Sequence, residues 1–282
     1  MRKMPRLVSR EAATTAPLPG LRAEGTVGTG CDQFAGLQGP KASRAPSGKT
    51  GSRADGIAAA LAPAIASAEG CRILVYGRTR WGKSAFARHL VMAVLDSHVA
   101  ETVLVHDVKY PDNAQFVGEN VTAITQIGEA MQRGSVVVLR PPVSAMEAAH
   151  VARLLSECRE PTLLLIDETR RALGGSQIWC DGKNPDGTQG PRSFEWLCLE
   201  GGGLGASLVL LVQRPRQLPG DAVDSAQVHV VFGLGGRSLA YLVAAGTVPP
   251  EAAATVRALK PGAFCLFTDD EEWNGITYYS PE

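Results

Sequence analysis

Short apolar runs alternate with amphipathic stretches along most of the chain after residue 55. Several runs are continuous in Val, Ile and Leu, which is typical of strands covered on both faces of a parallel sheet. The predicted strands are residues 73–76, 103–107, 136–139, 163–167, 208–213, 228–232 and 264–267. Apolar residues at helical spacing predict helices over 57–68, 84–96, 124–133, 145–158 and 194–199. This alternation predicts an α/β domain with a mostly parallel central sheet.

The first 55 residues differ from the rest in composition. They are rich in Gly, Pro, Ser, Ala and Arg, lack sustained periodicity, and hold nine Lys and Arg against four Asp and Glu. Such a segment does not bury enough apolar surface to offset the loss of chain entropy on folding. The sequence therefore predicts a disordered basic tail over residues 1–55 and one folded domain over 56–282.

Overall composition adds little to a functional assignment. The chain has 282 residues, 45% of them hydrophobic, and a formal net charge of zero, so the total charge does not indicate an anionic partner. No apolar run reaches membrane-spanning length, and no apolar core follows the basic residues at the N-terminus. Six cysteines without a C-x-x-C pair predict free thiols in a reducing compartment. We therefore expect a cytoplasmic protein without a membrane span.

Residues 77–84 read GRTRWGKS and match the phosphate-loop motif G-x-x-x-x-G-K-[ST]. The motif lies between a predicted strand and a predicted helix, which is the context that a phosphate site requires. Lys83 is expected to reach the β- and γ-phosphates of ATP, and the Ser84 hydroxyl to bind Mg²⁺. The predicted nucleotide-contacting residues are Gly77, Arg78, Thr79, Arg80, Trp81, Gly82, Lys83, Ser84 and Ala85.

A second buried strand ends in the pair Asp167 and Glu168. In a hydrolytic site, Asp167 would hold Mg²⁺ and Glu168 would polarise the attacking water. The alternative is a strand that merely ends in solvated acids. The phosphate loop about eighty residues upstream favours the catalytic interpretation.

A third buried strand ends at Gln213. In open α/β folds, the carboxyl ends of the strands form the edge where ligands bind. Gln213 is therefore a candidate for contact with the γ-phosphate or the attacking water, and for reporting hydrolysis to the rest of the protein. The alternative is a glutamine that caps a loop.

These elements, in this order, resemble the FtsK/HerA superfamily of P-loop ATPases over about residues 70–270. The matching segments are 77–84, Asp167-Glu168, Gln213-Arg214-Pro215 and 232–239. The best subfamily match is the genome-packaging ATPases of membrane-containing viruses and related phages. The resemblance implies a RecA-like (ASCE) P-loop NTPase fold with helices on both faces of the sheet. It also implies a homo-oligomeric ring, commonly a hexamer, that drives double-stranded DNA through its pore using ATP, in the host cytoplasm or associated with the virion.

The resemblance does not locate the arginine that completes such a site from a neighbouring subunit. Relatives often carry it just before the glutamine strand, where this chain has glycines within 199–205. Arg237 and Arg214 are the first candidates for stabilising transition-state charge, followed by Arg192. The alternative for each is an ordinary surface or structural role.

The variable positions of the phosphate loop carry two arginines and a tryptophan. Arg78 and Arg80 are candidates for contact with phosphate or with a neighbouring subunit. Trp81 is a candidate for a stacking contact, and the alternative is an exposed loop aromatic with no partner.

The DNA-contacting residues are the least determined part of the prediction. A translocating motor grips phosphates rather than reading bases. Lys183 and Arg192, in a long glycine-rich loop over 170–192, are candidates for lining a pore. The basic tail is a candidate for additional DNA affinity, or for contact with capsid or membrane-vertex proteins. Solvated charge is the alternative for both segments.

The segment after the second predicted strand carries further polar residues. Asp107 and Lys109 are candidates for contact with nucleotide or an adjacent subunit, whereas His106 is expected to be a packed strand-end histidine.

Three alternatives to a packaging motor remain at this point. One is another FtsK/HerA-type motor, for conjugation or DNA processing. Another is a P-loop small-molecule kinase, with the loop over 170–192 as its lid. The last is a switch protein that uses nucleotide binding only to oligomerise. The pair Glu168 and Gln213 is better explained by hydrolysis than by phosphoryl transfer to another acceptor.

Overall fold

The computed structural model describes a defined part of the chain. The described residues are 56, 58, 61, 62, 65, 70–100, 102–107, 116–122, 126–133, 136–139, 162–169, 198, 206–218, 220–268 and 273–278. The predicted tail over 1–55, the predicted helix over 145–158 and the long loop over 170–192 lie outside them. The boundary at residue 55 therefore stays a prediction.

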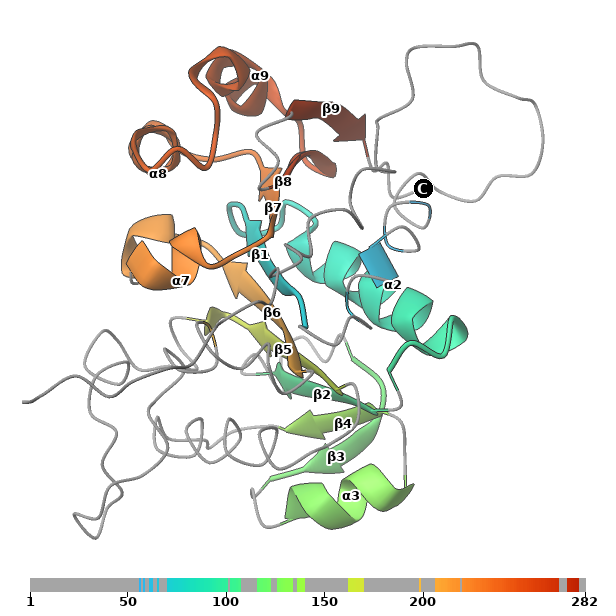
Figure 1. The fold of residues 1–282 in the computed structure, drawn as a ribbon. Coiled ribbons are helices and arrows are strands. Elements are labelled where there is room, and N and C mark those ends of the chain that lie inside the picture. The colour runs from blue at the N-terminus through green and yellow to red at the C-terminus, as the bar shows by residue number, and fades with distance from the viewer. Residues whose placement is uncertain are drawn as a thin grey trace, which may run out of the picture. The chain divides into compact units, whose positions relative to one another are not determined.

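Within this part of the chain, nine strands form one sheet (Figure 1). They are β1 (Arg72–Tyr76), β2 (Thr102–Asp107), β3 (Glu119–Val121), β4 (Val136–Leu139), β5 (Thr162–Asp167), β6 (Ala206–Val212), β7 (Val228–Phe232), β8 (Ala263–Thr268) and β9 (Trp273–Tyr278). Their order is β3-β4-β2-β5-β6-β1-β7-β8-β9. The strands from β3 through β7 in this order run parallel, and the pairs β7–β8 and β8–β9 are antiparallel.

All seven predicted strands are confirmed, and their ends differ from the prediction by at most two residues. The strands β3 and β9 were not predicted. Gln213 follows β6 directly instead of ending it. The mostly parallel central sheet is therefore confirmed, with an antiparallel extension at one edge.

Helices connect the strands. The described ones are α2 (Lys83–Asp96), α3 (Ile127–Arg133), α7 (Gly220–Asp224), α8 (Gly236–Ala244) and α9 (Ala253–Ala258), with short 3₁₀ turns η5 (Pro215–Gln217) and η6 (Pro250–Ala252). Residues 58, 61, 62 and 65 of the predicted helix over 57–68 are helical and buried, and Cys198 is helical within the predicted 194–199. No helix in these segments is long and apolar enough to cross a bilayer.

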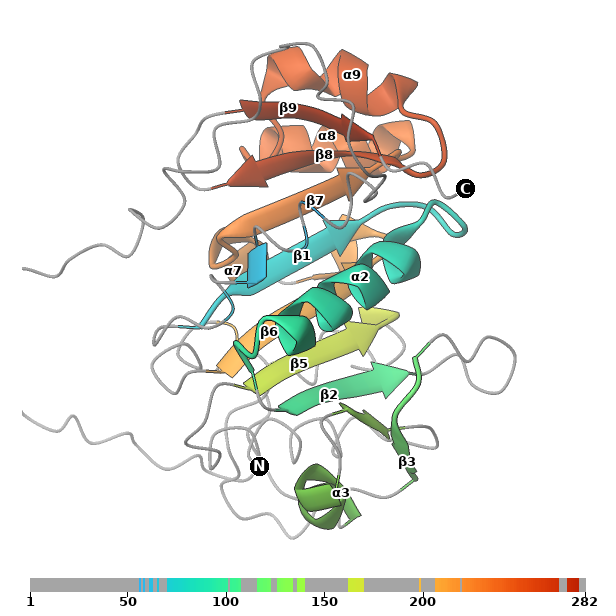
Figure 2. The ribbon, with the colours of Figure 1, turned by 90° about the vertical axis from the view of Figure 1, so that its right-hand side faces the viewer.

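The two faces of the sheet are covered by different helices (Figure 2). On one face, Phe86 and Leu90 of α2 pack with Val75 of β1 and with apolar residues of β2, β5 and β6. On the other face, Leu239 and Leu242 of α8 belong to the cluster that contains alternate residues of the same strands, together with residues of α3, α7 and α9. This alternation is what a strand buried on both faces requires. The predicted layers are confirmed.

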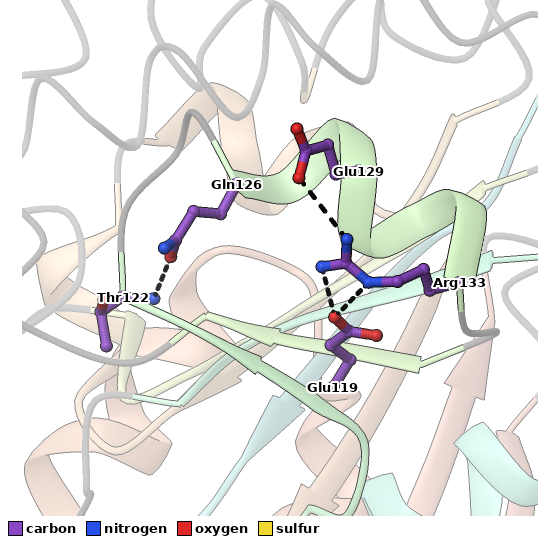
Figure 3. Close-up of polar contacts among 5 residues, drawn as sticks. All are labelled: Glu119, Thr122, Gln126, Glu129 and Arg133. Atoms are coloured by element: carbon purple, nitrogen blue, oxygen red, sulfur yellow. Dashed lines mark hydrogen bonds and ion pairs between the residues drawn. The ribbon is translucent and has the colours of Figure 1, made fainter.

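Polar contacts join α3 to the edge strand β3 (Figure 3). The Thr122 backbone N–H donates to Gln126 Oε1 at 3.0 Å, at the start of the helix. Arg133 Nε donates to Glu119 Oε1 at 2.7 Å, and Arg133 Nη1 lies 3.5 Å from Glu129 Oε2, one turn away. The Arg133 side chain is 54% exposed, so solvent screens these ion pairs. These contacts join α3 to β3 at the edge of the sheet, whereas the core is formed by the apolar clusters.

Candidate nucleotide-binding site

The phosphate loop joins β1 to α2, as the sequence predicts. All of β1 is buried, and α2 begins at Lys83 with Gly82 as its N-cap. Gly82 has φ 101°, a left-handed conformation that glycine adopts without steric cost. The N-terminus of α2 therefore opens directly onto the loop, where its free N–H groups favour an anion.

The first glycine of the loop is fixed by close packing. A Cβ on Gly77 would lie 2.7 Å from the Phe232 Cβ of β7, which is closer than real Cβ atoms come. The Gly77 N–H donates to the Val212 carbonyl of β6 at 3.1 Å. The loop therefore starts where β1, β6 and β7 converge, and only glycine fits there.

Lys83 lies inside the loop and is 5% exposed. Its Nζ donates to the Gly77 carbonyl at 2.8 Å and to the Arg78 carbonyl at 2.9 Å. These contacts hold a positive charge at the centre of the loop. This placement suits an ammonium group that binds phosphate oxygens.

Ser84 and Asp167 lie at the carboxyl edge on the same side of the sheet. Leu163 and Leu165 of β5 pack in the cluster that contains α2, and alternation places Asp167 on that face as well. Ser84 is the second residue of α2 and is buried, and Asp167 is 1% exposed. A hydroxyl and a carboxylate are hard oxygen donors of the kind that Mg²⁺ prefers, so the donor set fits the ion.

The structure brings the candidates Glu168 and Gln213 together, whereas the sequence nominated each of them separately for the γ-phosphate or the attacking water. The Gln213 Nε2 group donates to Glu168 Oε1. Glu168 has φ 56°, a left-handed conformation that is uncommon for a residue other than glycine. The neighbouring Thr169 hydroxyl is buried and donates to the Leu211 carbonyl of β6 at 3.0 Å, which anchors this turn to the strand that precedes Gln213.

Sequence reasoning missed the side chain that connects this pair to the phosphate loop. The Thr79 hydroxyl donates to Gln213 Oε1 at 3.2 Å, across 134 residues of sequence. Thr79 was predicted only as one of the loop residues around the nucleotide. No local pattern indicates such a contact, because it depends on β6 lying beside β1 in the sheet.

Trp81 has contacts with other residues, so the alternative of an exposed loop aromatic with no partner is wrong. Its ring lies against Gly233, where an added Cβ would meet Trp81 Cζ3 at 2.0 Å. The Arg78 guanidinium lies 5.4 Å from the Trp81 ring centroid, and Arg78 Nη2 donates to the Leu234 carbonyl at 2.9 Å. The phosphate loop is thereby attached to the segment between β7 and α8. A role of Arg78 on phosphate stays a prediction.

Three other candidate arginines, Arg80, Arg214 and Arg237, are exposed. Arg80 has φ 63° within the loop, Arg214 follows Gln213, and Arg237 is the second residue of α8. All three follow parallel strands at the carboxyl edge of the sheet. The remaining candidates, Lys109, Lys183 and Arg192, lie outside the described residues.

His106 is buried within β2, and burial lowers its pKa to about 4. The ring is therefore neutral at neutral pH, in line with the predicted packed histidine. The next residue, Asp107, is fully buried and lies in register with Asp167 on the neighbouring strand. The sequence nominated Asp107 for contact with nucleotide or a neighbouring subunit, but it did not place Asp107 beside Asp167.

A phosphate loop between β1 and α2, on a mostly parallel sheet covered on both faces, defines a P-loop NTPase with a RecA-like fold. Comparison with known proteins agrees with this class. No family model and no curated protein sequence matches the chain. Solved structures do match.

The genome packaging NTPase B204 from Sulfolobus turreted icosahedral virus 2, in complex with ATP-γS, superposes with a TM-score of 0.56; it is 20% identical, over 76% of this chain and 98% of that one. B204 from Sulfolobus turreted icosahedral virus, described as a DNA-packaging ATPase, superposes with a TM-score of 0.54 and is 19% identical, over 75% of this chain and 98% of that one. VirB4 of Thermoanaerobacter pseudethanolicus superposes with a TM-score of 0.51 and is 10% identical, over 75% of this chain and 89% of that one. The predicted resemblance is confirmed at the level of the fold: the chain has the fold of FtsK/HerA-type P-loop ATPases.

Proposed function

We propose that this protein is an ATP-hydrolysing motor that translocates double-stranded DNA, with the packaging of a viral genome as its role. The observation that carries the proposal is the hydrogen-bonded connection from the phosphate loop through Gln213 to Glu168. In hydrolysis, water activated by a carboxylate attacks the γ-phosphorus of the nucleotide that the phosphate loop holds. The loop and the carboxylate therefore have to lie close together. The packaging role is supported by the shared fold with B204, a protein described as a DNA-packaging ATPase.

The binding step follows from the loop. Its backbone N–H groups and the Lys83 ammonium would hold the β- and γ-phosphates, with the N-terminus of α2 adding favourable dipole charge. Ser84 and Asp167 would hold Mg²⁺ between them. When bound, Mg²⁺ neutralises charge that develops on the phosphate oxygens.

The chemical step falls to Glu168. Its carboxylate would accept a proton as the water oxygen bonds to the γ-phosphorus and the bond to the bridging β,γ-oxygen breaks, which releases ADP and phosphate. Gln213, beside Glu168, would sense whether the γ-phosphate is present. Loss of that phosphate would change the contacts of Gln213 and, through it, those of β6.

The assembly is also a proposal. A homo-oligomeric ring, commonly a hexamer in this family, would place Arg237 of one subunit against the nucleotide of its neighbour. DNA would be gripped through its phosphates without regard to sequence, in the host cytoplasm or at the virion. Capsid or membrane-vertex proteins would then dock the motor.

The test is ATP hydrolysis by the purified full-length protein, with and without linear double-stranded DNA. We expect DNA to stimulate turnover, and Glu168→Gln to lower it by at least about 100-fold while nucleotide still binds. Lys83→Ala should lose both nucleotide binding and turnover. Glu251→Gln, which changes an exposed glutamate in η6, is the matched control and should behave as wild type.

ATP turnover that DNA does not stimulate would overturn the proposal of a DNA-translocating motor. It would favour a small-molecule kinase if phosphate is passed to an acceptor other than water. Nucleotide binding without turnover, coupled to a change in oligomeric state, would favour a switch protein.

A further inference from the structure

Three side chains from distant parts of the sequence form a hydrogen-bonded chain at the carboxyl edge of the sheet. Thr79, the third residue of the phosphate loop, donates through its hydroxyl to Gln213 Oε1 at 3.2 Å. Gln213 follows β6, and its Nε2 group donates to Glu168 Oε1 after β5. The loop that surrounds phosphate is thereby connected to the carboxylate proposed to activate water.

The chemistry of the groups fixes the direction of both bonds. An ionised carboxylate only accepts, so the amide has to present its NH₂ group to Glu168. Its oxygen then faces Thr79, and an amide oxygen also only accepts, so the Thr79 hydroxyl has to donate. Rotating the amide by 180° would set oxygen against carboxylate oxygen. Each bond therefore favours the amide orientation that the other requires.

The backbone at Glu168 is held independently of its side chain. Glu168 is in the left-handed region, and the adjacent Thr169 hydroxyl anchors the turn to Leu211. The Glu168 carboxylate accepts a hydrogen bond from the Gln213 amide, and both side chains are half-buried. The oxygen of the same amide accepts a hydrogen bond from the exposed Thr79, so a change at Thr79 can reach the carboxylate through Gln213.

We propose that Thr79 is a positioning residue for ATP hydrolysis: its hydroxyl orients the Gln213 amide, which in turn orients the Glu168 carboxylate toward the attacking water. This inference rests on the proposed function for its effect on turnover. It assigns to a variable position of the phosphate loop a role that does not involve binding the nucleotide. Because Thr79 is part of the loop, movement of the loop on nucleotide binding would reach Glu168 through the same two bonds.

The kinetic test compares Thr79→Val, which keeps the shape but removes the hydroxyl, with Thr79→Ser, which keeps the hydroxyl. We expect Thr79→Val to lower kcat by about tenfold, since one orienting hydrogen bond is lost, with KM for ATP within about twofold of wild type. Thr79→Ser should retain at least about half of the wild-type kcat. In a Gln213→Ala background, Thr79→Val should have no further effect, because the residue through which it acts is gone.

A second readout does not depend on hydrolysis. The side-chain NH₂ signal of Gln213, followed by NMR with nitrogen-15-labelled glutamine and assigned with Gln213→Ala, should move in Thr79→Val and stay in place in Thr79→Ser. If wild type does not hydrolyse ATP, the proposed function fails, and this signal alone decides whether Thr79 orients Gln213. An unchanged signal in Thr79→Val would overturn the inference. So would an effect on KM alone, or equal losses of kcat in the valine and serine variants.

Discussion

At the residue scale, Gly233 lies directly against the Trp81 ring of the phosphate loop. The ring can occupy this position only because residue 233 has no side chain. An added Cβ would stand 2.0 Å from Cζ3 and 2.5 Å from Cη2 of the ring. Gly233→Ala therefore has to displace the indole and the Arg78 guanidinium beside it. We expect a loss of about 1–3 kcal/mol of unfolding free energy, and weaker binding of a fluorescent ATP analogue. Urea unfolding and a binding titration measure the two effects.

Gly235, in the same segment between β7 and α8 as Gly233, supplies the control. A Cβ added to Gly235 would meet nothing within 4 Å, and φ there is −72°, so Gly235→Ala should change stability by less than about 0.5 kcal/mol. Removing the ring should also relieve the clash: Trp81→Ala with Gly233→Ala should be no less stable than Trp81→Ala alone. A Gly233→Ala protein as stable as Gly235→Ala would contradict the packing argument.

Some residues of the candidate site could be predicted from sequence motifs, and others only from the arrangement of the strands. The motif at 77–84 indicated Lys83 and Ser84, because a phosphate site needs a fixed spacing along the chain. The acids at the end of β5 were predicted from a buried run followed by charge. The contacts Thr79–Gln213 and Trp81–Gly233 could not be predicted, because they follow from which strands are neighbours in the sheet.

At the element scale, α2 is held to the sheet by an aromatic cluster. The Phe86 ring centroid lies 5.2 Å from that of Phe264 and 6.4 Å from that of Phe232, and all three side chains are fully buried. Phe86→Ala should therefore cost about 3–5 kcal/mol of unfolding free energy, measured by urea denaturation. Met92→Ala, on the same helix but 56% exposed, should change it by less than about 0.5 kcal/mol. Equal effects of the two substitutions would contradict this account of α2.

Elements with continuous apolar runs were predicted well, and short or polar ones were not. The strand β3 has three residues, Glu119–Val121, and forms because they pair with β4 in parallel register. The strand β9 contains a glycine and polar residues and is specified by its antiparallel pairing with β8. Helices of five and six residues, such as α7 and α9, are too short for a period of 3.6 to show in the sequence. Tertiary pairing overrides weak local preference in these elements.

At the scale of the whole molecule, the order of the strands places the candidate functional segments at one edge of the sheet. The glutamine strand β6 lies between the phosphate-loop strand β1 and the acidic strand β5, and β7 lies on the other side of β1. Arg237 follows β7 on the exposed start of α8. It therefore lies at the same carboxyl edge of the sheet as the phosphate loop, with an exposed side chain. If the protein forms the proposed ring, this side chain is available to a neighbouring subunit.

Mixing two inactive variants tests whether Arg237 acts across such an interface. Arg237→Ala and Glu168→Gln should each be nearly inactive alone, because one lacks the charge that stabilises the transition state and the other lacks the base. If Arg237 acts in trans, some interfaces in mixed rings pair an intact Glu168 with an intact Arg237. Random mixing in equal amounts makes these about a quarter of all interfaces, so ATP turnover should reappear on mixing.

Native mass spectrometry shows whether the two variants share rings, which is the condition for interpreting the mixture. Co-assembly without recovered turnover would mean that Arg237 acts within its own subunit, since no subunit then holds both groups. Full turnover by Arg237→Ala alone would remove this arginine from the site altogether and leave Arg214, directly after Gln213, as the next candidate. The experiment thus separates a trans role, a cis role and a surface role for one exposed arginine at the carboxyl edge of the sheet.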